Sequence, residues 1–211
     1  MAGLSLVILM FGTGSPAAQV VPDDGVRRAI TGCPFGTTGA LIALSPVGKI
    51  SGAHINPVVT VGFRLMGRLE LKVTLSYILA QLAGGVLGPL PLLAWGEMGR
   101  SVAFGATFPG PEYGILTAFM GEVVTTFAMI PLLATFLAYR KFRPYTLALF
   151  PLLYSLIVWT EAPISGTSTN PARSLGPAVI RAVPGVVALL DRPAAGDSPG
   201  PSDVRFPGQA N

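Results

Sequence analysis

Two stretches of this sequence share one pattern. Residues 50–62 read ISGAHINPVVTVG, and residues 164–176 read ISGTSTNPARSLG. Ile-Ser-Gly is followed in both by three residues and then Asn-Pro, and the two copies lie 114 residues apart (170 − 56). Five identities in an eight-residue frame indicate an internal duplication.

The composition around these copies is that of a membrane protein. The 211 residues include only 14 Lys or Arg and 10 Asp or Glu, which is 11% of the chain, against about 25% in soluble domains. Apolar residues make up 51%, and there are 26 Gly and 20 Pro, as in closely packed membrane helices. One Cys and one His argue against a disulfide framework or an imidazole metal site, and the scattered net charge of +4 argues against nucleic acid as a partner.

The charge-free stretches predict where the chain crosses a bilayer, which takes about 20 apolar residues. Stretches 29–48, 73–96 and 144–160 carry no charge, and 113–139 carries only Glu122. Residues 1–14 are apolar but short, so they predict a first helix that begins abruptly. The alternative is a signal peptide, although no Lys or Arg precedes its apolar core.

Three predicted spans separate the two Asn-Pro copies, so the second copy is inverted relative to the first. The apolar stretches after each Asn, 57–67 and 171–180, are only half the length of a span. Asn is a favoured helix cap and Pro a favoured first helical residue. We therefore expect two half-helices that follow non-helical segments 50–55 and 164–169 and direct their positive ends at the membrane midplane. Asn amides there would orient a file of neutral molecules while the positive ends repel cations.

At these residues the sequence resembles the major intrinsic protein family, the aquaporins and aquaglyceroporins. The pore motifs would be Asn56-Pro57-Val58, with Val in place of the usual Ala, and Asn170-Pro171-Ala172 followed by Arg173. Residues 12–15 (GTGS), 80–85 (AQLAGG) and Glu122 resemble further family positions. Ser174 after the Arg favours the aquaporin branch over the glycerol branch.

The resemblance implies an all-α membrane protein in which an inverted repeat of tilted helices carries two half-helices that meet at the midplane. It implies a passive channel for water or small neutral solutes, assembled as a homotetramer with one pore per subunit. It also implies no enzymatic activity, no cofactor and no metal.

The resemblance further implies a selectivity filter of four residues. Counting back without gaps from each Asn gives Gly36 and Val158, and the loop gives Thr167 and Arg173. A slip of one residue would replace Gly36 by Phe35. Gly and Val are smaller than the Phe and His of water-selective members, and Val158 removes a polar group, which predicts passage of glycerol or urea as well as water.

Three further residues carry expectations. His54 is expected to be a buried, hydrogen-bonded residue beside the pore, and Glu122 to accept hydrogen bonds from the second loop. The alternative for Glu122 is a role in proton relay. Glu161 near the end of its span is expected to be solvated, or alternatively to tune the pore mouth or brace Arg173.

The predicted organisation is a channel domain over residues 1–180, with repeats at about 1–96 and 113–180. Residues 181–211 are rich in Pro and Gly and predict a disordered polar tail where the family has its sixth helix. The alternative functions are therefore a non-conducting truncated channel or membrane scaffold and, with less support, a secondary transporter. Basic residues at the predicted turns outnumber those on the other side by seven to three, as expected for a multi-pass protein of the plasma (inner) membrane.

Overall fold

The computed structural model describes residues 2–12 and 14–182, and this part of the chain consists of helices and the turns between them. The predicted polar tail begins at residue 181, but the last helix continues through Ala182; residues 183–211, which carry the rest of the predicted tail and the predicted absence of a sixth helix, lie outside the described part. The α-helices are α1 (Ala2–Phe11), α2 (Pro16–Val20), α3 (Asp24–Leu44), α4 (Pro46–Ser51), α5 (Pro57–Leu65), α6 (Leu71–Leu87), α7 (Gly96–Ser101), α8 (Ile115–Ala138), α9 (Thr146–Ser165) and α10 (Pro171–Ala182). Short 3-10 turns lie at η1 (Leu90–Trp95), η2 (Ala103–Gly105) and η3 (Arg143–Tyr145).

Four helical stretches are long and apolar enough to cross a membrane: Ala2–Val20, Leu71–Ser101, Ile115–Ala138 and Arg143–Ser165. Helix α3 has 21 residues, about 31 Å at 1.5 Å per residue, which also matches the hydrocarbon core. Its first turns carry Asp24, Arg27 and Arg28, so the apolar part of the helix begins only at Ala29. The all-helical membrane fold predicted from the sequence is confirmed.

Local sequence explains where the helices differ from the predicted stretches. The span expected at 29–48 begins earlier, because Asp23 caps α3 by accepting a hydrogen bond from Val26 N (2.7 Å), and it breaks at Ser45, where Pro46 begins α4. The span expected at 73–96 contains a break after Leu87, where Pro89 and Pro91 impose the 3-10 turn η1.

The two non-helical segments also begin later than expected. Ile50 and Ser51 belong to α4, and Ile164 and Ser165 belong to α9. Both helices end at a glycine in the left-handed region, Gly52 (φ 73°) and Gly166 (φ 84°), which is a common way for a helix to stop.

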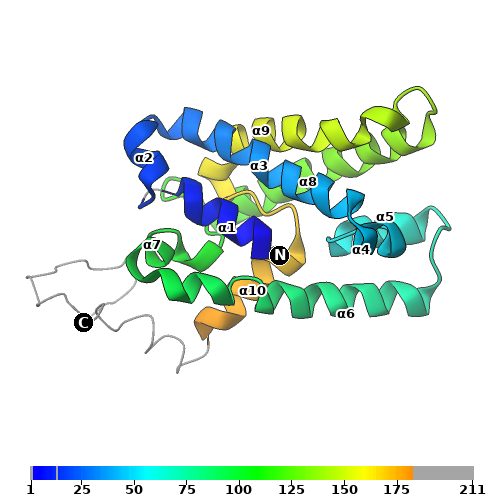
Figure 1. Ribbon diagram of the computed structural model, residues 1–211, viewed down its shortest axis with the longest axis horizontal. Coiled ribbons are helices and arrows are strands. Elements are labelled where there is room, and N and C mark those ends of the chain that lie inside the picture. Colours follow the sequence, from blue (N-terminus) through cyan, green and yellow to red (C-terminus); the bar gives the residue numbers. More distant parts are fainter. Residues whose placement is uncertain (1, 13, 183–211) are drawn as a thin grey trace, which may run out of the picture.

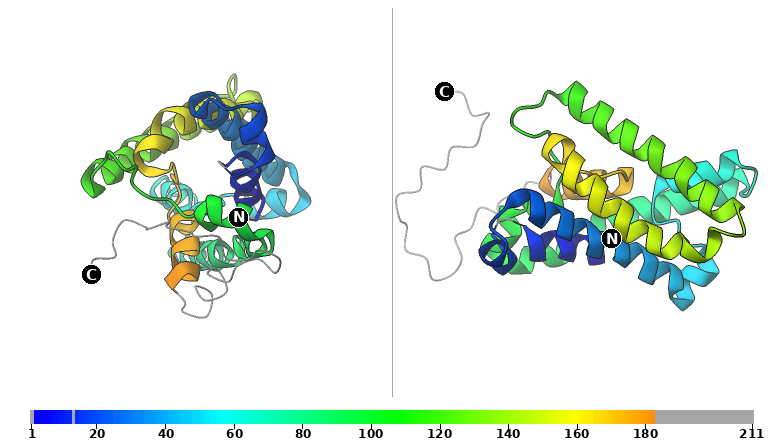
Figure 2. Two further views of the ribbon diagram at one scale, coloured as in Figure 1. Left: turned by 90° about the vertical axis from the view of Figure 1, so that its left-hand side faces the viewer. Right: turned by 90° about the horizontal axis from the view of Figure 1, so that it is seen from above.

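The long helices run roughly along one direction, and the two half-helices lie in opposite halves of the molecule (Figure 1). Helix α5 occupies one end, while α10 begins near the middle and runs toward the other. Seen along the long axis, the long helices surround the segments that lead into α5 and α10 (Figure 2). The paired half-helices predicted from the repeat are therefore present.

Two helix pairs pack with their backbones in contact. Helix α3 lies against α9 at Gly32 and Gly36, where an added Cβ would overlap the main chain of Tyr154 and Phe150. Helix α6 lies against α10 at Gly85 and Gly176, where an added Cβ would overlap a carbonyl oxygen of the opposite helix. Small residues that let backbones approach are typical of membrane helix interfaces.

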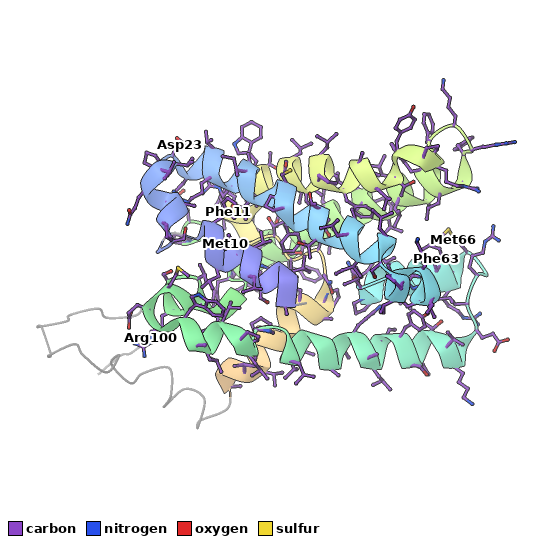
Figure 3. All side chains as sticks on the ribbon, viewed as in Figure 1. Met10, Phe11, Asp23, Phe63, Met66 and Arg100 are labelled. Carbon is purple, nitrogen blue, oxygen red and sulfur yellow. The ribbon has the colours of Figure 1, made fainter. Side chains whose placement is uncertain are left out.

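The polar connections gather at the two ends of the bundle. Asp23 and Arg100 lie toward one end, and Phe63 and Met66 toward the other (Figure 3). The turn between α8 and α9, which carries Arg140, Lys141 and Arg143, lies at the same end as the turn between α5 and α6 (Figure 1). This arrangement matches a bundle whose flanks face lipid and whose ends face water.

Candidate pore site

The backbone of the two loops before the half-helices repeats its conformation as well as its sequence. After the two glycines, Ala53 (φ 49°) and Ile55 (φ 57°) in the first loop correspond to Thr167 (φ 49°) and Thr169 (φ 49°) in the second. Positive φ is unfavourable for residues with a Cβ, especially β-branched ones, and such strain persists only where surrounding contacts enforce it. The same strained positions recur 114 residues apart, which indicates that the loop conformation serves the site.

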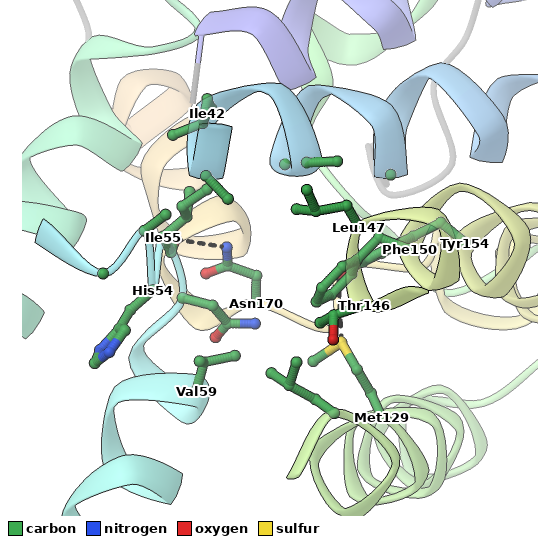
Figure 4. Close-up of a pocket in the computed structure, with 18 of the residues that line it drawn as sticks. Ile42, His54, Ile55, Val59, Met129, Thr146, Leu147, Phe150, Tyr154 and Asn170 are labelled. Atoms are coloured by element: carbon green, nitrogen blue, oxygen red, sulfur yellow. Dashed lines mark hydrogen bonds between the residues drawn. The ribbon is translucent and has the colours of Figure 1, made fainter. Parts of the chain in front are cut away.

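The two asparagines bind each other's loops. Asn56 Nδ2 donates to the carbonyl oxygen of Thr169 (2.7 Å), and Asn170 Nδ2 donates to the carbonyl oxygen of Ile55 (3.1 Å; Figure 4). Two of the four strained residues, Ile55 and Thr169, are thus the ones whose carbonyls accept these bonds. The exchange joins the ends of the two half-helices at the centre of the molecule.

Each asparagine also caps its own half-helix. Asn56 Oδ1 accepts a hydrogen bond from Val58 N (2.9 Å), and Asn170 Oδ1 accepts one from Ala172 N (3.1 Å). Pro57 and Pro171 occupy the first helical positions, where the missing N–H costs nothing. A side-chain amide has two N–H groups, so each Asn retains one for a molecule in the lumen.

Glu122 of α8 accepts hydrogen bonds from the second loop. Its Oε1 accepts hydrogen bonds from Ser168 N (2.6 Å) and Ser165 Oγ (2.7 Å), and its Oε2 accepts one from Thr169 N (2.6 Å). Hydrogen bonds to a carboxylate are among the strongest in proteins. Glu122 therefore fixes the strained backbone that presents the Thr169 carbonyl.

The first loop is held by neutral groups. His54 Nδ1 lies 3.2 Å from Thr60 Oγ1, and the His54 ring stacks on Phe63 with 4.5 Å between centroids. Gln81 Nε2 donates to the same Thr60 oxygen (2.9 Å), and Tyr77 OH donates to the carbonyl of Ser51 (2.7 Å). His54 is thus half-buried and hydrogen-bonded beside the pore.

Both asparagines line an inner pocket of about 330 Å³ (Figure 4). Its walls are mostly apolar and come from α3, α5, α8 and α9. Labelled residues around the asparagines in Figure 4 include Val59, Met129, Phe150 and Tyr154. The Asn amides are therefore polar groups set in an apolar passage.

An outer pocket of about 260 Å³ lies beyond the asparagines and contains three of the four predicted filter residues. Val158, Thr167 and Arg173 line it, and all three are buried. Phe35 lines it as well, and the Arg173 guanidinium lies 5.6 Å from the centroid of the Phe35 ring. Of the residues that line the two pockets, Phe35 alone is common to both.

The structure places Gly36 away from this group. Gly36 faces the main chain of Phe150 on α9 and lines the inner pocket, so Phe35, not Gly36, stands beside Arg173. The ungapped count from Asn56 crosses the break between α3 and α4, where Ser45 is not helical.

Glu161 lies elsewhere than expected. Only 3% of its surface is exposed, so it is not a solvated residue at the membrane interface. It accepts a hydrogen bond from Ser165 Oγ, which also bonds Glu122, and it packs against Gly121 of α8. Ser165 follows Glu161 by one helical turn, which the sequence shows, but the contact with Gly121 of α8 is not visible in the sequence.

Within residues 2–12 and 14–182, no group of three or more His, Cys, Asp or Glu side chains is placed to hold a metal. The polar side chains that line the two pockets are the two asparagine amides, the His54 imidazole, the Asp24 carboxylate, the hydroxyls of Thr31, Thr146, Tyr154 and Thr167, and the guanidinium groups of Arg27, Arg28, Arg143 and Arg173. The asparagine amides can donate hydrogen bonds to a neutral molecule.

Comparison with known proteins gives consistent results. The family described as major intrinsic protein matches residues 2–183. Aquaporin Z of Rhodopseudomonas palustris is 34% identical over 181 residues, which cover 80% of this chain and 73% of that protein. Aquaporin AqpM of Methanothermobacter marburgensis is 31% identical over 192 residues, covering 82% and 78% of the two chains. The solved aquaglyceroporin of Plasmodium falciparum resembles the fold with a TM-score of 0.59 at 22% identity, over 85% of this chain and 78% of that one.

Proposed function

The chain belongs to the major intrinsic protein family, and from this premise we propose that it is a passive channel for water and small uncharged solutes that excludes protons and ions. The observation that carries the proposal is the reciprocal pair of asparagines. Each amide caps a half-helix and crosses to the opposite loop, and both line the inner pocket.

The asparagines supply the selection against charge. A water that passes them accepts hydrogen bonds from the free Asn N–H groups, so its oxygen is held and its own hydrogens point away along the lumen. The positive ends of α5 and α10 face this point and raise the energy of any cation there. A neutral molecule exchanges its water contacts for these donors and passes.

We propose Phe35, Val158, Thr167 and Arg173 as the selectivity filter. Phe35 and Val158 provide an apolar wall, while Arg173 provides donors and a positive charge that opposes cations. Such a wall suits a solute with both carbon–hydrogen and hydroxyl faces, such as glycerol, and urea is the second candidate. The small Val158 is the basis for expecting passage beyond water.

We also propose a homotetramer in the plasma (inner) membrane, with one pore in each subunit. The exposed apolar side chains on α6 and α8, including Leu79, Phe119 and Phe127, suit contact with lipid or with a neighbouring subunit.

One observation favours a second candidate, a non-conducting membrane scaffold. A groove of about 630 Å³ between α5 and α8 is lined by Glu122, Asn170 and Ser174 together with exposed apolar residues such as Phe127. Polar pore groups that open to lipid are costly, so a subunit with this groove uncovered would lose its closed passage. Secondary transport has less support, because both oxygens of Glu122 are engaged by backbone amides.

Stopped-flow light scattering on proteoliposomes tests the proposal. A sucrose gradient reports water permeability, and glycerol and urea gradients report solute permeability. We expect water flux several-fold above empty liposomes and measurable glycerol flux. If glycerol and urea fluxes equalled those of bare lipid, the proposed passage of solutes other than water would be excluded. If the protein were inserted and water flux still equalled that of bare lipid, the non-conducting scaffold would be favoured.

A further inference from the structure

The outer pocket has an excess of positive charge. Arg27, Arg28 and Arg173 all line it, and Asp24 is the one carboxylate among its lining residues. The filter described above uses only Arg173. The role of the other two arginines therefore needs a separate explanation.

Arg27 is satisfied within the fold. Its Nη1 donates to the carbonyl oxygen of Val21 (2.8 Å), and its Nη2 pairs with Asp24. Only 6% of Arg27 is exposed, whereas the Asp24 side chain is exposed, so Arg27 forms the wall of the pocket. The negative charge of Asp24 is thereby committed to Arg27.

Arg28 and Arg173 have unused donors. Arg28 Nε is buried, as are Nε and Nη1 of Arg173, and none of these atoms has a hydrogen-bond acceptor among the residues that the structure describes. Arg173 is only 8% exposed. A buried charged donor without an acceptor is unfavourable, so these groups are arranged for an acceptor that enters the pocket.

The neighbouring glutamates do not supply that acceptor. Glu122 accepts hydrogen bonds from Ser168 N and Thr169 N, and Glu161 Oε1 shares the Ser165 hydroxyl with Glu122, while Glu161 Oε2 is buried and makes no hydrogen bond to Arg173. Neither glutamate lines the outer pocket.

Apolar residues also line the pocket. Ile8, Phe11, Val158 and Ala162 complete the pocket with apolar surface, which strengthens electrostatic attraction by excluding water.

We propose that the outer pocket is a binding site for a small oxyanion, of the class of inorganic phosphate or a short carboxylate, held between Arg28 and Arg173. The volume of about 260 Å³ accommodates such an anion together with several waters of about 30 Å³ each. Planar guanidinium groups match the paired oxygens of these anions. Because Arg173 is also a filter residue, a bound anion occludes the passage and lowers its permeability; this second statement rests on the proposed function.

Direct binding tests the site independently of conduction. Inorganic phosphate is titrated calorimetrically into the full chain in neutral-lipid nanodiscs, for the unmodified protein, Arg28→Gln, Arg28→Lys and Arg68→Gln. Arg68 is exposed at the α5–α6 turn, at the opposite end of the molecule, and serves as the matched control. We expect saturable binding that weakens at least tenfold in Arg28→Gln, persists in part in Arg28→Lys and is unchanged in Arg68→Gln.

The proposal would be overturned if phosphate did not bind saturably. It would also be overturned if folded Arg28→Gln bound phosphate with the same affinity as the unmodified protein. If the protein bound an anionic lipid added to the nanodisc but not free phosphate, the proposal would be overturned in favour of a lipid headgroup. In proteoliposomes, external phosphate at constant osmolality should slow water flux of the unmodified chain and of Arg68→Gln but not of Arg28→Gln. Phosphate binding that does not slow water flux would overturn the occlusion. A chain that binds phosphate but conducts no water would overturn the proposed function, whereas the proposed anion site would stand.

Discussion

At the scale of single residues, the site depends on a few hydrogen bonds that hold an unfavourable backbone. Thr169 has a positive φ, and three neighbours explain why it keeps it. Glu122 accepts its N–H, Asn56 donates to its carbonyl, and its hydroxyl lies 3.0 Å from Tyr154 OH. Removing one of these partners should release the loop and with it the alignment of the two asparagines.

Glu122→Gln tests the carboxylate that holds this loop. One of its two acceptor atoms becomes an NH₂ donor, which faces a backbone N–H and cannot bond it. We expect a loss of about 2 kcal/mol, seen as a fall in melting temperature of about 4–8 °C in detergent, together with reduced water flux. Glu112→Gln, at an exposed position before α8, should leave both unchanged. Equal melting temperatures for the two variants would argue against this role.

Phe35 and Gly36 give a paired test of the filter. Phe35→Ala removes the ring that stands between the two pockets and beside Arg173, so glycerol permeability should rise several-fold while the protein still folds. Gly36→Ala places a methyl group against the Phe150 carbonyl, which should cost about 1–3 kcal/mol and lower the melting temperature. The opposite pattern, with flux altered by Gly36→Ala alone, would restore Gly36 to the filter.

Residues inside the motifs were predictable, and those outside them less so. Asn56 and Asn170 followed from the repeat, because a cap, a proline and a fixed spacing determine their local positions, whereas Arg173 was expected from the family resemblance. Gly36 was assigned to the filter by an ungapped count back from Asn56, which crosses the break between α3 and α4. The sequence shows this break only as Ser45-Pro46. The burial of Glu161 depends on its contact with Gly121 of another helix, which no local pattern encodes.

At the scale of elements, the two half-helices are supported unequally. Helix α10 packs along α6 through Gly85 and Gly176, with backbone against backbone. Gly62 holds the position in α5 that Gly176 holds in α10, but its nearest neighbour is the side chain of Ile130, and Gly62 lines the open groove. The second half-helix is therefore fixed by a close helix contact that the first lacks among the described residues.

Gly176→Ala tests the α6–α10 contact. The added methyl group would overlap the Gly85 carbonyl, so the helices must separate. We expect a loss of about 1–3 kcal/mol, measured as a lower melting temperature and greater protease sensitivity of the loop before α10. Gly39→Ala in α3, where an added Cβ meets nothing within 4 Å, is the matched control and should be neutral or slightly stabilising. A Gly176→Ala protein as stable as Gly39→Ala would contradict close packing.

The helices themselves were largely predictable, because spans without charge are long enough to be recognised and Asn-Pro determines where α5 and α10 begin. Their ends were less predictable. The breaks at Pro46 and Pro89, and the two glycine caps, lie within apolar stretches where hydropathy does not change.

At the scale of the whole molecule, most charges lie in the turns and helix ends, whereas Glu122, Glu161 and Arg173 lie at the central site. The turn that carries Arg140, Lys141 and Arg143 follows α8, whereas Glu112 precedes it. A membrane protein places the side with more Lys and Arg in the cytoplasm. The basic turn should therefore be cytoplasmic and the connection before α8 external.

Cysteine labelling tests this orientation. In a Cys33→Ser background, which removes the one native thiol, a membrane-impermeant maleimide should label Glu112→Cys in intact cells. Arg140→Cys should be labelled only after permeabilisation, because the reagent must reach the other side. Labelling of both from outside would exclude α8 as a span, and the reverse pattern would invert the proposed topology.

The central claim is that neutral molecules pass between Asn56 and Asn170. Its most direct test is the osmotic water permeability of proteoliposomes that contain equal amounts of the unmodified chain, Asn56→Asp or Asn170→Asp. Each Asp keeps the helix cap but cannot donate to the opposite loop, so its carboxylate faces the carbonyl of Thr169 or Ile55. The account predicts fast water flux in the unmodified protein and a reduction of at least fivefold in both variants. Flux that is unchanged in folded, inserted Asn56→Asp and Asn170→Asp proteins would show that water does not pass between the asparagines, and would contradict the account.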